Sequence, residues 1–383
     1  MSMDGPPLPA ILVRGDDPAW DEWLGVVARD IYHGARYHHF SHGCGEGDPY
    51  LVVVGDNDRG LAWPYLLRPT SELKGLEGSS ATDVGSVYGY PGPIAWGCAP
   101  GDEFVRRAWA ALVGVWRDQG AVSAFTRFHP LLDNAALLAG VEGSWAGSRR
   151  ASGSVVAVGP TVSVDCTLDD DAARGQYARA LRQHIAAGRR AGLVTVDDDD
   201  WSDLEAFCRL YHETMARNRA SASYFFDLSY FRRLTIALSG HLHLLVTKLG
   251  DDIAAAGLFT EFDGIVQAHL VGTNGDLRSL SPFKVLLDDA RAWARARGDV
   301  ILHLGGGRGG RDDSLFRFKG EFSPRRHVFH VGRWVLDPAS CHDLLEARMA
   351  ALSLGATLDA AFFPAYRAPE IEAAELRTPL AEP

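Results

Sequence analysis

The sequence predicts an α+β fold that consists of two similar domains, each with strands and helices mixed. The chain has 383 residues, which is more than one hydrophobic core usually serves. Helix and strand patterns follow each other in the same sort of order in both halves, and antiparallel hairpins lie in the middle of each half. We expect a first domain over residues 1–153, a second over 154–337, and a tail at 338–383 that packs back on the first domain.

In the first half, the spacing of apolar residues predicts helices, and turn-rich loops separate the strands. Trp20, Trp23 and Leu24 recur at helical spacing after Asp17-Pro18, which is a helix start signal. The loop GDNDRG at 55–60 separates two apolar strands. The predicted elements are a helix at 17–31, strands at 49–54 and 61–67, an amphipathic helix at 101–119 and a strand at 121–128.

The second half repeats this alternation of helices and strands. Ser281-Pro282 predicts a helix start, with serine as the cap and proline at the first helical position. That helix ends at Gly298, before a strand at 300–304. The other predicted elements are strands at 161–167, 193–197, 241–249, 252–262, 265–273 and 326–335, a basic helix at 170–191, helices at 201–219 and 228–238, and a helix at the start of the tail.

Composition describes an ordinary globular protein of the cytoplasm. Hydrophobic residues make up 46% of the chain and charged residues 23%. No run of about 18 apolar residues predicts a membrane span, and the N-terminus lacks the basic segment and apolar core of a secretory signal. The cysteines are odd in number and far apart, which favours reduced thiols. They are Cys44, Cys98, Cys166, Cys208 and Cys341.

The charge distribution suits a phosphate-bearing ligand better than the net charge does. The net charge of −11 argues against a protein that coats nucleic acid. However, residues 174–192 contain five arginines and no acid, and residues 305–333 contain seven basic residues against three acidic ones. A tRNA end or a coenzyme would suit such a surface, and a solvated helix face explains it equally well. The candidate phosphate contacts are Arg179, Arg182, Arg189, Arg190, Arg308 and Arg311.

Residues 301–322 form the most informative stretch of the chain. An apolar strand runs into a glycine-rich loop at 305–310, and a short helical turn leads to Phe318-Lys319-Gly320. A lysine held between an aromatic residue and a glycine is suited to stabilise negative charge that develops during a reaction. A solvated lysine in a turn is the alternative. The loop lacks the Lys-Ser/Thr ending of a P-loop and the spacing of a dinucleotide-binding turn, so ATPase and NAD functions are disfavoured.

Two further motifs are better explained without chemistry. His38, His39, His42 and Cys44 lie close together, but their spacing matches no standard zinc site, and we expect no metal. Ser281 and Lys284 have the serine–lysine spacing of penicillin-binding enzymes without the companion motifs, and the helix cap accounts for the serine.

The helix that ends near residue 219 combines basic and aromatic side chains. Arg217 and Arg219 lie at its end, and Tyr224 follows within the aromatic run YFF. Guanidinium groups beside exposed rings can bind an anion and stack on a ring, which makes these three residues candidates for substrate binding. Basic residues that only complement the helix dipole are the alternative.

Four segments together resemble the Fem family of aminoacyl-tRNA-dependent peptidyltransferases. The similar segments, in chain order, are SVYGYPGPI (86–94), YHETMARNRASASYFFDLSYFRRL (211–234), GTNGDLRSLSPFKVLLDDARAWARARG (272–298) and DSLFRFKGEF (313–322). The resemblance implies two tandem GNAT-like acyltransferase domains without a coiled-coil arm. It also implies that Phe318 and Lys319 are the catalytic Phe-Lys pair, that Arg217 holds the acceptor substrate, and that Tyr88 and Tyr90 contact substrate.

The resemblance implies an aminoacyltransferase that forms an amide bond between an amino acid and an amine-bearing small molecule or peptide. The amino acid comes from aminoacyl-tRNA as co-substrate, with no bound cofactor. An amine with a pKa of about 7.7–8.0 is partly neutral near pH 7, so a strong base is not obligatory. Bridge-forming relatives carry an acid after the Gly-Pro pair, where this chain has Ile94-Ala95-Trp96. This departure favours natural-product tailoring, such as antibiotic biosynthesis, over cell-wall bridge formation.

Two other functions stay open at the level of sequence. An acyl-CoA-dependent N-acyltransferase on the same scaffold is the first, because the arginines and the glycine loop suit a pyrophosphate as well as a tRNA end. A binding protein that has lost the reaction is the second. The expected partners are charged tRNA and the amine acceptor, with no membrane, and we expect a monomer.

Overall fold

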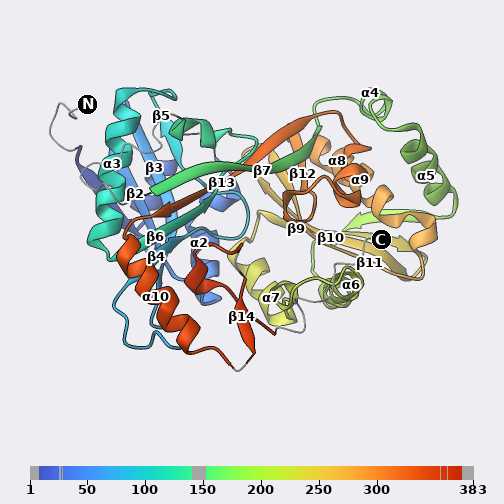
Figure 1. Ribbon diagram of the computed structural model, residues 1–383. Helices are drawn as coiled ribbons and strands as arrows, with labels where there is room; N and C mark the ends of the chain where they lie inside the picture. Colours follow the sequence, from blue (N-terminus) through green and yellow to red (C-terminus); the bar gives the residue numbers. More distant parts are fainter. Residues whose placement is uncertain are drawn as a thin grey trace. The chain divides into compact units, whose positions relative to one another are not determined.

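The computed structural model describes residues 8–25, 27, 29–139, 152–353, 355–359 and 361–372. The chain forms two compact units, each a mixed sheet flanked by helices (Figure 1). Unit 1 contains residues 1–27, 32–157 and 330–383, and unit 2 contains residues 28–31 and 158–329. The chain therefore crosses between units at 157/158 and 329/330, where the sequence predicted 153/154 and 337/338. The short piece at 28–31 has no counterpart in the prediction.

The sheet of unit 1 has the strand order β1-β2-β3-β4-β6-β13, and β5 pairs with β3. Neighbours are antiparallel except β4 and β6, which are parallel. Strands β7 and β13 each have residues in both units. The elements are β1 (Ala10–Arg14), α1 (Ala19–Leu24), α2 (Ala35–Gly43), β2 (Asp48–Gly55), β3 (Gly60–Pro69), β4 (Thr82–Gly85), β5 (Ile94–Trp96), α3 (Glu103–Asp118), β6 (Ala121–Arg127), β13 (Arg326–Val335) and α10 (Pro338–Ala350).

Tryptophans fill the main core of unit 1. Helix α3 turns Trp109 and Trp116 toward the sheet, because its apolar residues recur every three or four positions. They pack around Trp63 of β3 and Trp334 of β13, with ring centroids 5.0–6.0 Å apart. Four large rings in contact remove a large apolar area from water, and this burial stabilises the unit.

The segment after β13 packs on unit 1. Its helix α10 contributes Leu344 to a core cluster with Val122 of β6 and Tyr366. Tyr366 also donates a hydrogen bond to Asp83, a fully buried carboxylate on β4. The last eleven residues of the predicted tail, 373–383, lie outside the described part of the chain.

The sheet of unit 2 has the strand order β7-β12-β11-β10-β9-β8. Neighbours are antiparallel except β11 and β12, which are parallel. The elements are β7 (Ser152–Asp165), α4 (Asp170–Gly175), α5 (Arg179–Arg190), β8 (Leu193–Asp197), α6 (Leu204–Arg217), α7 (Leu228–Ala237), β9 (Leu242–Leu249), β10 (Asp252–Phe262), β11 (Ile265–Thr273), α8 (Pro282–Arg297), β12 (Ile301–Gly306) and α9 (Ser314–Gly320).

Three predicted helical features differ from the structure. The basic helix at 170–191 is two helices, because Ala178 is extended and its N–H bonds to the carbonyl of Glu321, a contact distant in sequence. The helix predicted at 17–31 is limited to α1, and Val26 and Ala28 lie outside the described residues. Ser281 precedes α8 as predicted, but it has a left-handed backbone and its side chain makes no capping hydrogen bond.

Candidate active site

The parallel strands β11 and β12 of unit 2 form a fork. Their paired register ends at Gln267 and His303, whereas β11 continues to Thr273 and β12 to Gly306. The carboxyl ends of parallel strands in open sheets are common ligand sites, because the following loops and helix ends gather there. Among the predicted residues, Lys319 and Arg217 lie at this edge.

Lys319 reaches the end of β12 from helix α9. Asp313 caps this helix by accepting from the N–H of Phe316 at 3.0 Å. The Lys319 ammonium donates to the carbonyl oxygen of Gly306 at 2.7 Å, which is the one acceptor that the described residues provide for it. Burial lowers the pKa of Lys319 to about 8, against the opposing charge of Asp313. The residue as a whole is partly exposed, but its ammonium is desolvated by burial.

Arg217 reaches the end of β11 from the last turn of α6. Its Nη2 donates to the carbonyl oxygen of Thr273 at 2.9 Å and to Thr214 Oγ1 at 3.0 Å. The same hydroxyl oxygen accepts from the N–H of Thr273 at 2.9 Å, which fixes α6 against the strand end. Two cations thus bind carbonyls at the ends of adjacent strands, and both are suited to meet an anionic or developing oxyanion group.

The other two predicted substrate contacts of α6 lie in the exposed segment after it. Arg219 has a left-handed backbone and is exposed. Tyr224 is 42% exposed, and its carbonyl oxygen accepts from the Tyr211 hydroxyl at 2.6 Å. Tyr224 is therefore held close to α6 by its backbone.

Phe318 faces the core. Its ring stacks on Phe283 of α8 with centroids 5.3 Å apart, and it meets Phe322 edge-on at 5.7 Å. Adjacent residues of α9 therefore point in different directions: Phe318 anchors the helix and Lys319 reaches the strand end.

Half of the arginines predicted to contact phosphate bind other parts of the protein. Arg189 pairs with Asp288 and Asp289, Arg182 donates to three carbonyls around the end of α4, and Arg308 pairs with Asp313 at 3.0 Å. The partners of Arg189 are about 100 residues away, so local sequence gave no signal of this pairing. The remaining three, Arg179, Arg190 and Arg311, are exposed.

The glycine-rich loop is explained in part by packing. A Cβ atom on Gly310, whose φ is +77°, would lie 2.4 Å from a methyl carbon of Val158. A Cβ atom on Gly307 would lie 2.1 Å from the carbonyl oxygen of Arg311. These glycines are needed for close approach within the protein, so the loop does not by itself indicate a phosphate cradle.

In unit 1, the predicted Tyr88 and Tyr90 follow β4, beside the end of its parallel neighbour β6. The Tyr90 ring meets Tyr32 edge-on at 6.0 Å and His129 at 6.3 Å, and burial raises its pKa. The sequence analysis did not identify Glu46. Burial raises the pKa of its carboxyl group, and the charges of Arg127 and Arg68 offset only part of this rise. Gly45 and Gly47, both with positive φ, flank this acid and were the available signal.

The histidine cluster and the serine–lysine pair serve other contacts. On α2, His38 Nδ1 lies 3.1 Å from the carbonyl oxygen of Gly34, and His39 Nε2 lies 2.7 Å from that of Gly15. Within the described ranges, no three His, Cys, Asp or Glu side chains gather as a metal site. Lys284 pairs with Glu321 at 2.8 Å.

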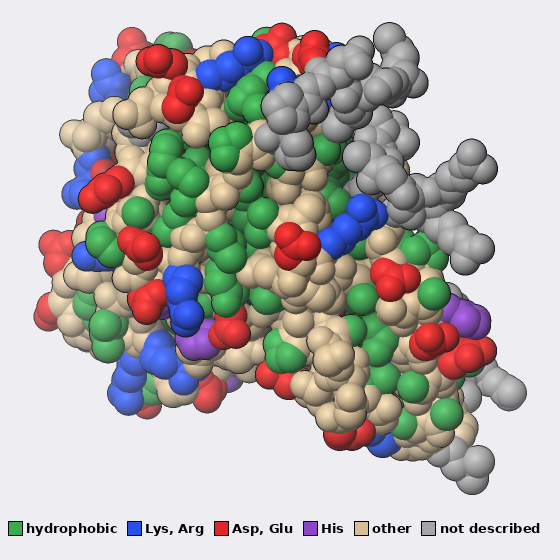
Figure 2. Space-filling model, turned by 90° about the vertical axis from the view of Figure 1, so that its left-hand side faces the viewer, with side chains coloured by type: hydrophobic (Ala, Val, Ile, Leu, Met, Phe, Trp, Pro, Cys, Tyr) green, Lys and Arg blue, Asp and Glu red, His purple; other side chains and the backbone are tan. Residues whose placement is uncertain are grey.

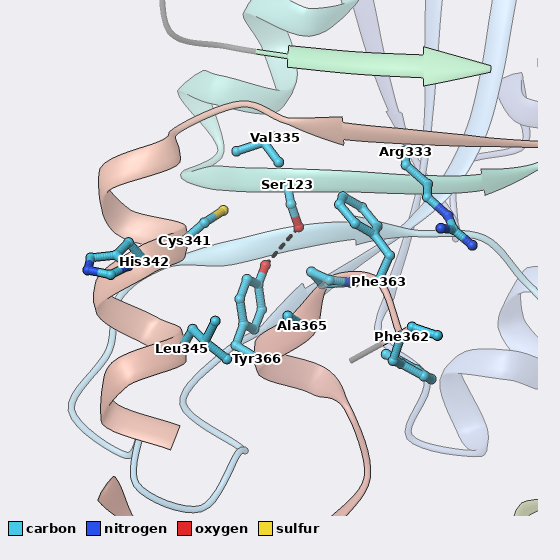
Figure 3. A pocket seen from close by; sticks show the side chains of 12 residues that line it. Ser123, Arg333, Val335, Cys341, His342, Leu345, Phe362, Phe363, Ala365 and Tyr366 are labelled. Atoms are coloured by element: carbon cyan, nitrogen blue, oxygen red, sulfur yellow. Dashed lines mark hydrogen bonds between the residues drawn. The ribbon is translucent and has the colours of Figure 1, made fainter. Parts of the chain in front are cut away.

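A cavity of about 600 Å³ lies in unit 1, apart from all of these residues. Figure 3 shows the hydroxyls of Ser123 and Tyr366 turned toward each other at its floor, 2.8 Å apart, with Cys341 and Leu345 of α10 on one side. None of the predicted site residues lines it. Since Tyr366 also binds Asp83, the floor belongs to the packing of the C-terminal segment.

Comparison with known proteins identifies the fold. Residues 173–319 match the family model described as an acetyltransferase (GNAT) domain. The chain is similar to a crystal structure of FemX, with 13% identity, coverage of 88% of this chain and 100% of that chain, and a TM-score of 0.61. The fold is a tandem GNAT-like fold. The predicted α+β class with two such domains is confirmed.

Two further solved structures are similar at lower scores. L-PGS from Bacillus licheniformis has 11% identity, coverage of 88% of this chain and 97% of that chain, and a TM-score of 0.49. A tandem GNAT protein from the clavulanic acid biosynthesis pathway has 12% identity, coverage of 85% and 98%, and a TM-score of 0.45. A search of curated protein sequences found no match. The match to the GNAT model supports an acyltransferase.

Two observations bear on possible partners. Across the described residues, no helix is both long and apolar enough to span a bilayer. On the coloured part of the face in Figure 2, acidic and basic side chains are interspersed around a band of hydrophobic ones, so no large basic patch lies there.

Proposed function

We propose that the protein transfers an aminoacyl group from aminoacyl-tRNA to the amine of a small molecule or peptide. The observation that carries this proposal is the placement of Lys319, a desolvated cation bound to the end of β12 beside the fork. A cation in that position stabilises an oxyanion more strongly than it would in water, because the surroundings are less polarisable.

The reaction requires one bond to form and one to break. The acceptor nitrogen attacks the ester carbonyl carbon, and the carbonyl oxygen becomes an oxyanion. As the amide forms, the ribose oxygen leaves and takes up the proton that the nitrogen loses. Lys319 would meet the oxyanion or the departing oxygen, and Arg217 would hold an anionic group of the acceptor. The step needs no metal and no bound cofactor.

The resemblance of four sequence segments to the Fem family and the exposed cations of unit 2 support a tRNA donor. Arg179, Arg190 and Arg311 are exposed. Protein–RNA contacts of this kind act mainly on phosphates, so their strength falls as salt rises. A tRNA donor would place the reaction in the cytoplasm.

The acceptor is better sought among small molecules than among cell-wall precursors. The segment after Pro93 is strand β5, whose three residues pair with β3 and include no acid. Where bridge-forming relatives carry a carboxylate, this protein therefore has a strand without an acidic residue. A tailoring reaction on an amine-bearing natural product fits this departure.

The second candidate is an acyl-CoA-dependent N-acyltransferase. The observation that favours it is the match of residues 173–319 to the GNAT acetyltransferase model, which covers the fork and Lys319. The same oxyanion chemistry would apply to a thioester, with a thiolate as the leaving group.

Treatment with RNase separates the two donors. The purified protein is incubated with tRNA, synthetases, a labelled amino-acid mixture and a pool of amines, and the products are identified by mass. The tRNA proposal expects a labelled amide that RNase abolishes and acetyl-CoA does not restore. An RNase-resistant product that requires acyl-CoA would establish the second candidate instead.

A further inference from the structure

A chain of buried hydrogen bonds lies at the base of the fork between β11 and β12. Asp30, Gln267 and His303 are 0%, 2% and 1% exposed. Gln267 Nε2 donates to Asp30 Oδ2 at 2.6 Å, and His303 Nδ1 lies 2.7 Å from Gln267 Oε1. Burial of a carboxylate and an imidazole costs free energy that an apolar trio of similar volume would avoid, so packing alone is a weak reason for this chain.

The two hydrogen bonds from Asp30 through Gln267 fix which nitrogen of the His303 ring carries a proton. The Asp30 carboxylate can only accept, so the Gln267 amide must present its NH2 group to it. The Gln267 oxygen then faces the ring and must accept a hydrogen bond, so Nδ1 of His303 donates. In a neutral imidazole with Nδ1 protonated, Nε2 is the basic atom. The intervening amide holds this tautomer without letting the proton pass to Asp30.

Gln267 and His303 lie at the point where strands β11 and β12 separate. Gln267 and His303 are the last paired residues of β11 and β12, and both strands carry an extra residue just beyond them. His269 is extra in β11 relative to β10, and Leu304 is extra in β12 relative to β7. Bulges of this kind are frequent next to active sites, where they redirect side chains. Three residues after His303, Gly306 accepts the hydrogen bond from Lys319.

Asp30 is delivered to the fork by the short segment at 28–31. This segment is fixed on unit 2 by two further contacts: the N–H of Arg29 bonds to Asp263 Oδ2 at 3.5 Å, and its guanidinium lies over the Phe262 ring at 5.3 Å. A carboxylate that is 237 residues away in sequence from its amide partner is thereby held rigidly in the core of unit 2.

We propose that His303 is the base that removes the proton from the acceptor nitrogen during acyl transfer, and that Asp30 and Gln267 are the positioning residues that hold it in the required tautomer. The proposal rests on the proposed function. Attack by a neutral amine leaves a positively charged nitrogen in the tetrahedral intermediate, and this nitrogen must lose one proton. Nε2 takes that proton, directly or across one water, and returns it to the departing ribose oxygen or, with a coenzyme donor, to the sulfur.

Other titratable groups surround the ring. They are Asp30, which is linked to the ring through Gln267, His269 on β11, and His327, which bonds through Nε2 to Ser163 Oγ at 2.7 Å. Ser163 is the register partner of His303 on β7. Burial lowers the pKa of His269 to about 4, with the charge of Asp30 opposing, so that ring is neutral at pH 7. Among these rings, His303 has its tautomer fixed by hydrogen bonds that reach back to a buried carboxylate.

Asp30→Asn tests the proposal with little change of shape. The new amide can donate to the Gln267 oxygen, so Gln267 can turn its NH2 group toward Nδ1 and the ring proton moves to Nε2. We expect ¹⁵N NMR of histidine-labelled protein to report an Nδ1-protonated His303 in the wild type and an Nε2-protonated one in the variant. His303→Gln assigns the signal. The kcat should fall by about 10²–10⁴-fold, the contribution of a general base, with KM nearly unchanged.

Matched variants distinguish this role from a structural one. Asp263→Asn removes an exposed carboxylate that touches the same segment and should leave both kcat and tautomer unchanged. Gln267→Met, which is isosteric and breaks both bonds, should lower kcat like Asp30→Asn while circular dichroism shows a folded protein. A wild-type ring protonated on Nε2, or full kcat in a folded Asp30→Asn or Gln267→Met, overturns the proposal. Absence of turnover with both donors overturns the proposed function, and the base with it, whatever the tautomer.

Discussion

Lys319 combines two properties that surface lysines lack: a fixed position and a weakened hold on its proton. Its ammonium is bound to one carbonyl at 2.7 Å, and burial is the main cause of its lowered pKa. Most lysines are solvated point charges on mobile stems. A desolvated ammonium fixed at a strand end is suited to charge that appears only in a transition state.

Replacing Lys319 by methionine should remove the cation and keep the shape of the side chain. We expect turnover to fall by about 10²–10³-fold, the usual effect of losing one oxyanion donor. Steady-state kinetics measures this change. Arg317→Met is the control, because Arg317 is an exposed residue of the same helix that pairs with Asp312 and should not affect turnover. Near-normal turnover in Lys319→Met would refute the assigned role.

The pH dependence of turnover should report the same group. The pKa of Lys319 is about 8, so the cation is present below that pH and is lost as the pH rises through it. We expect an alkaline decline of kcat between about pH 7 and 9. Lys319→Arg keeps the cation at every pH in this range, so the decline should move or vanish. A decline that is identical in both proteins must arise from another group.

At the level of elements, helices α4, α5 and α8 are joined by one buried carboxylate. Asp288 of α8 is 0% exposed and accepts from Arg174 at 3.1 Å, from Arg189 at 2.7 Å and from Tyr177 at 3.0 Å. This arrangement explains why residues 174–190 are basic without forming a continuous basic face. Two of its five arginines, Arg174 and Arg189, are partners of this one acid.

Asp288→Asn should therefore destabilise unit 2. Removal of the charge leaves two arginines without their buried partner, and because each is about one-third exposed we expect a moderate loss, about 2–3 kcal/mol of unfolding free energy. Urea denaturation measures it. Asp289→Asn is the control: Asp289 is partly exposed and pairs with Arg189, so its loss should cost less than about 1 kcal/mol. Equal stability of both variants would show that the cluster is solvated.

The sequence predicted the long helices and most strands of both units within a few residues, but it did not predict the short strands β1, β4 and β5, and β7 begins nine residues before the predicted strand at 161–167. Strands β9, β10 and β11 were predictable because turn-forming residues separate three apolar segments, and α3 because its apolar side recurs at helical spacing. The break between α4 and α5 was not predictable. It depends on the carbonyl of Glu321, more than 140 residues later, and local propensity carries no record of that contact.

The candidate site likewise contains residues that were predictable from the sequence and residues that were not. Lys319 and Arg217 were predictable as cations next to aromatic and glycine-rich sequence, and the structure brings both to the ends of β11 and β12. The hydrogen bonds that link Asp30, Gln267 and His303 were not predictable, because these residues come from three distant segments and none lies in a motif. The structural partners of Arg182, Arg189 and Arg308 were hidden for the same reason.

At the level of the whole molecule, the C-terminal segment completes unit 1. Arg367 forms an ion pair with Asp83, a fully buried carboxylate whose other charged partner is Arg68, at 2.5 Å. Arg367 is therefore part of a buried charge cluster in the first GNAT-like domain.

Arg367→Met should weaken unit 1, since it leaves Asp83 with a single arginine. We expect a loss of about 2–3 kcal/mol, the scale of a charged hydrogen bond, and a lower midpoint in thermal denaturation. His342→Ala removes an exposed residue of α10 that pairs with Glu346 and serves as the control. An unchanged midpoint in Arg367→Met would mean that the chain end does not contribute to the stability of the unit.

The most direct test of the account is aminoacyl transfer measured in wild-type protein and in Lys319→Met. Each protein is incubated with charged tRNA and a pool of amines, with and without RNase, and amide products are quantified by mass. The account predicts an RNase-sensitive amide from the wild type and about 10²–10³-fold less from the variant. Equal amide formation by both proteins, or none from the wild type with either aminoacyl-tRNA or acyl-CoA, would contradict it.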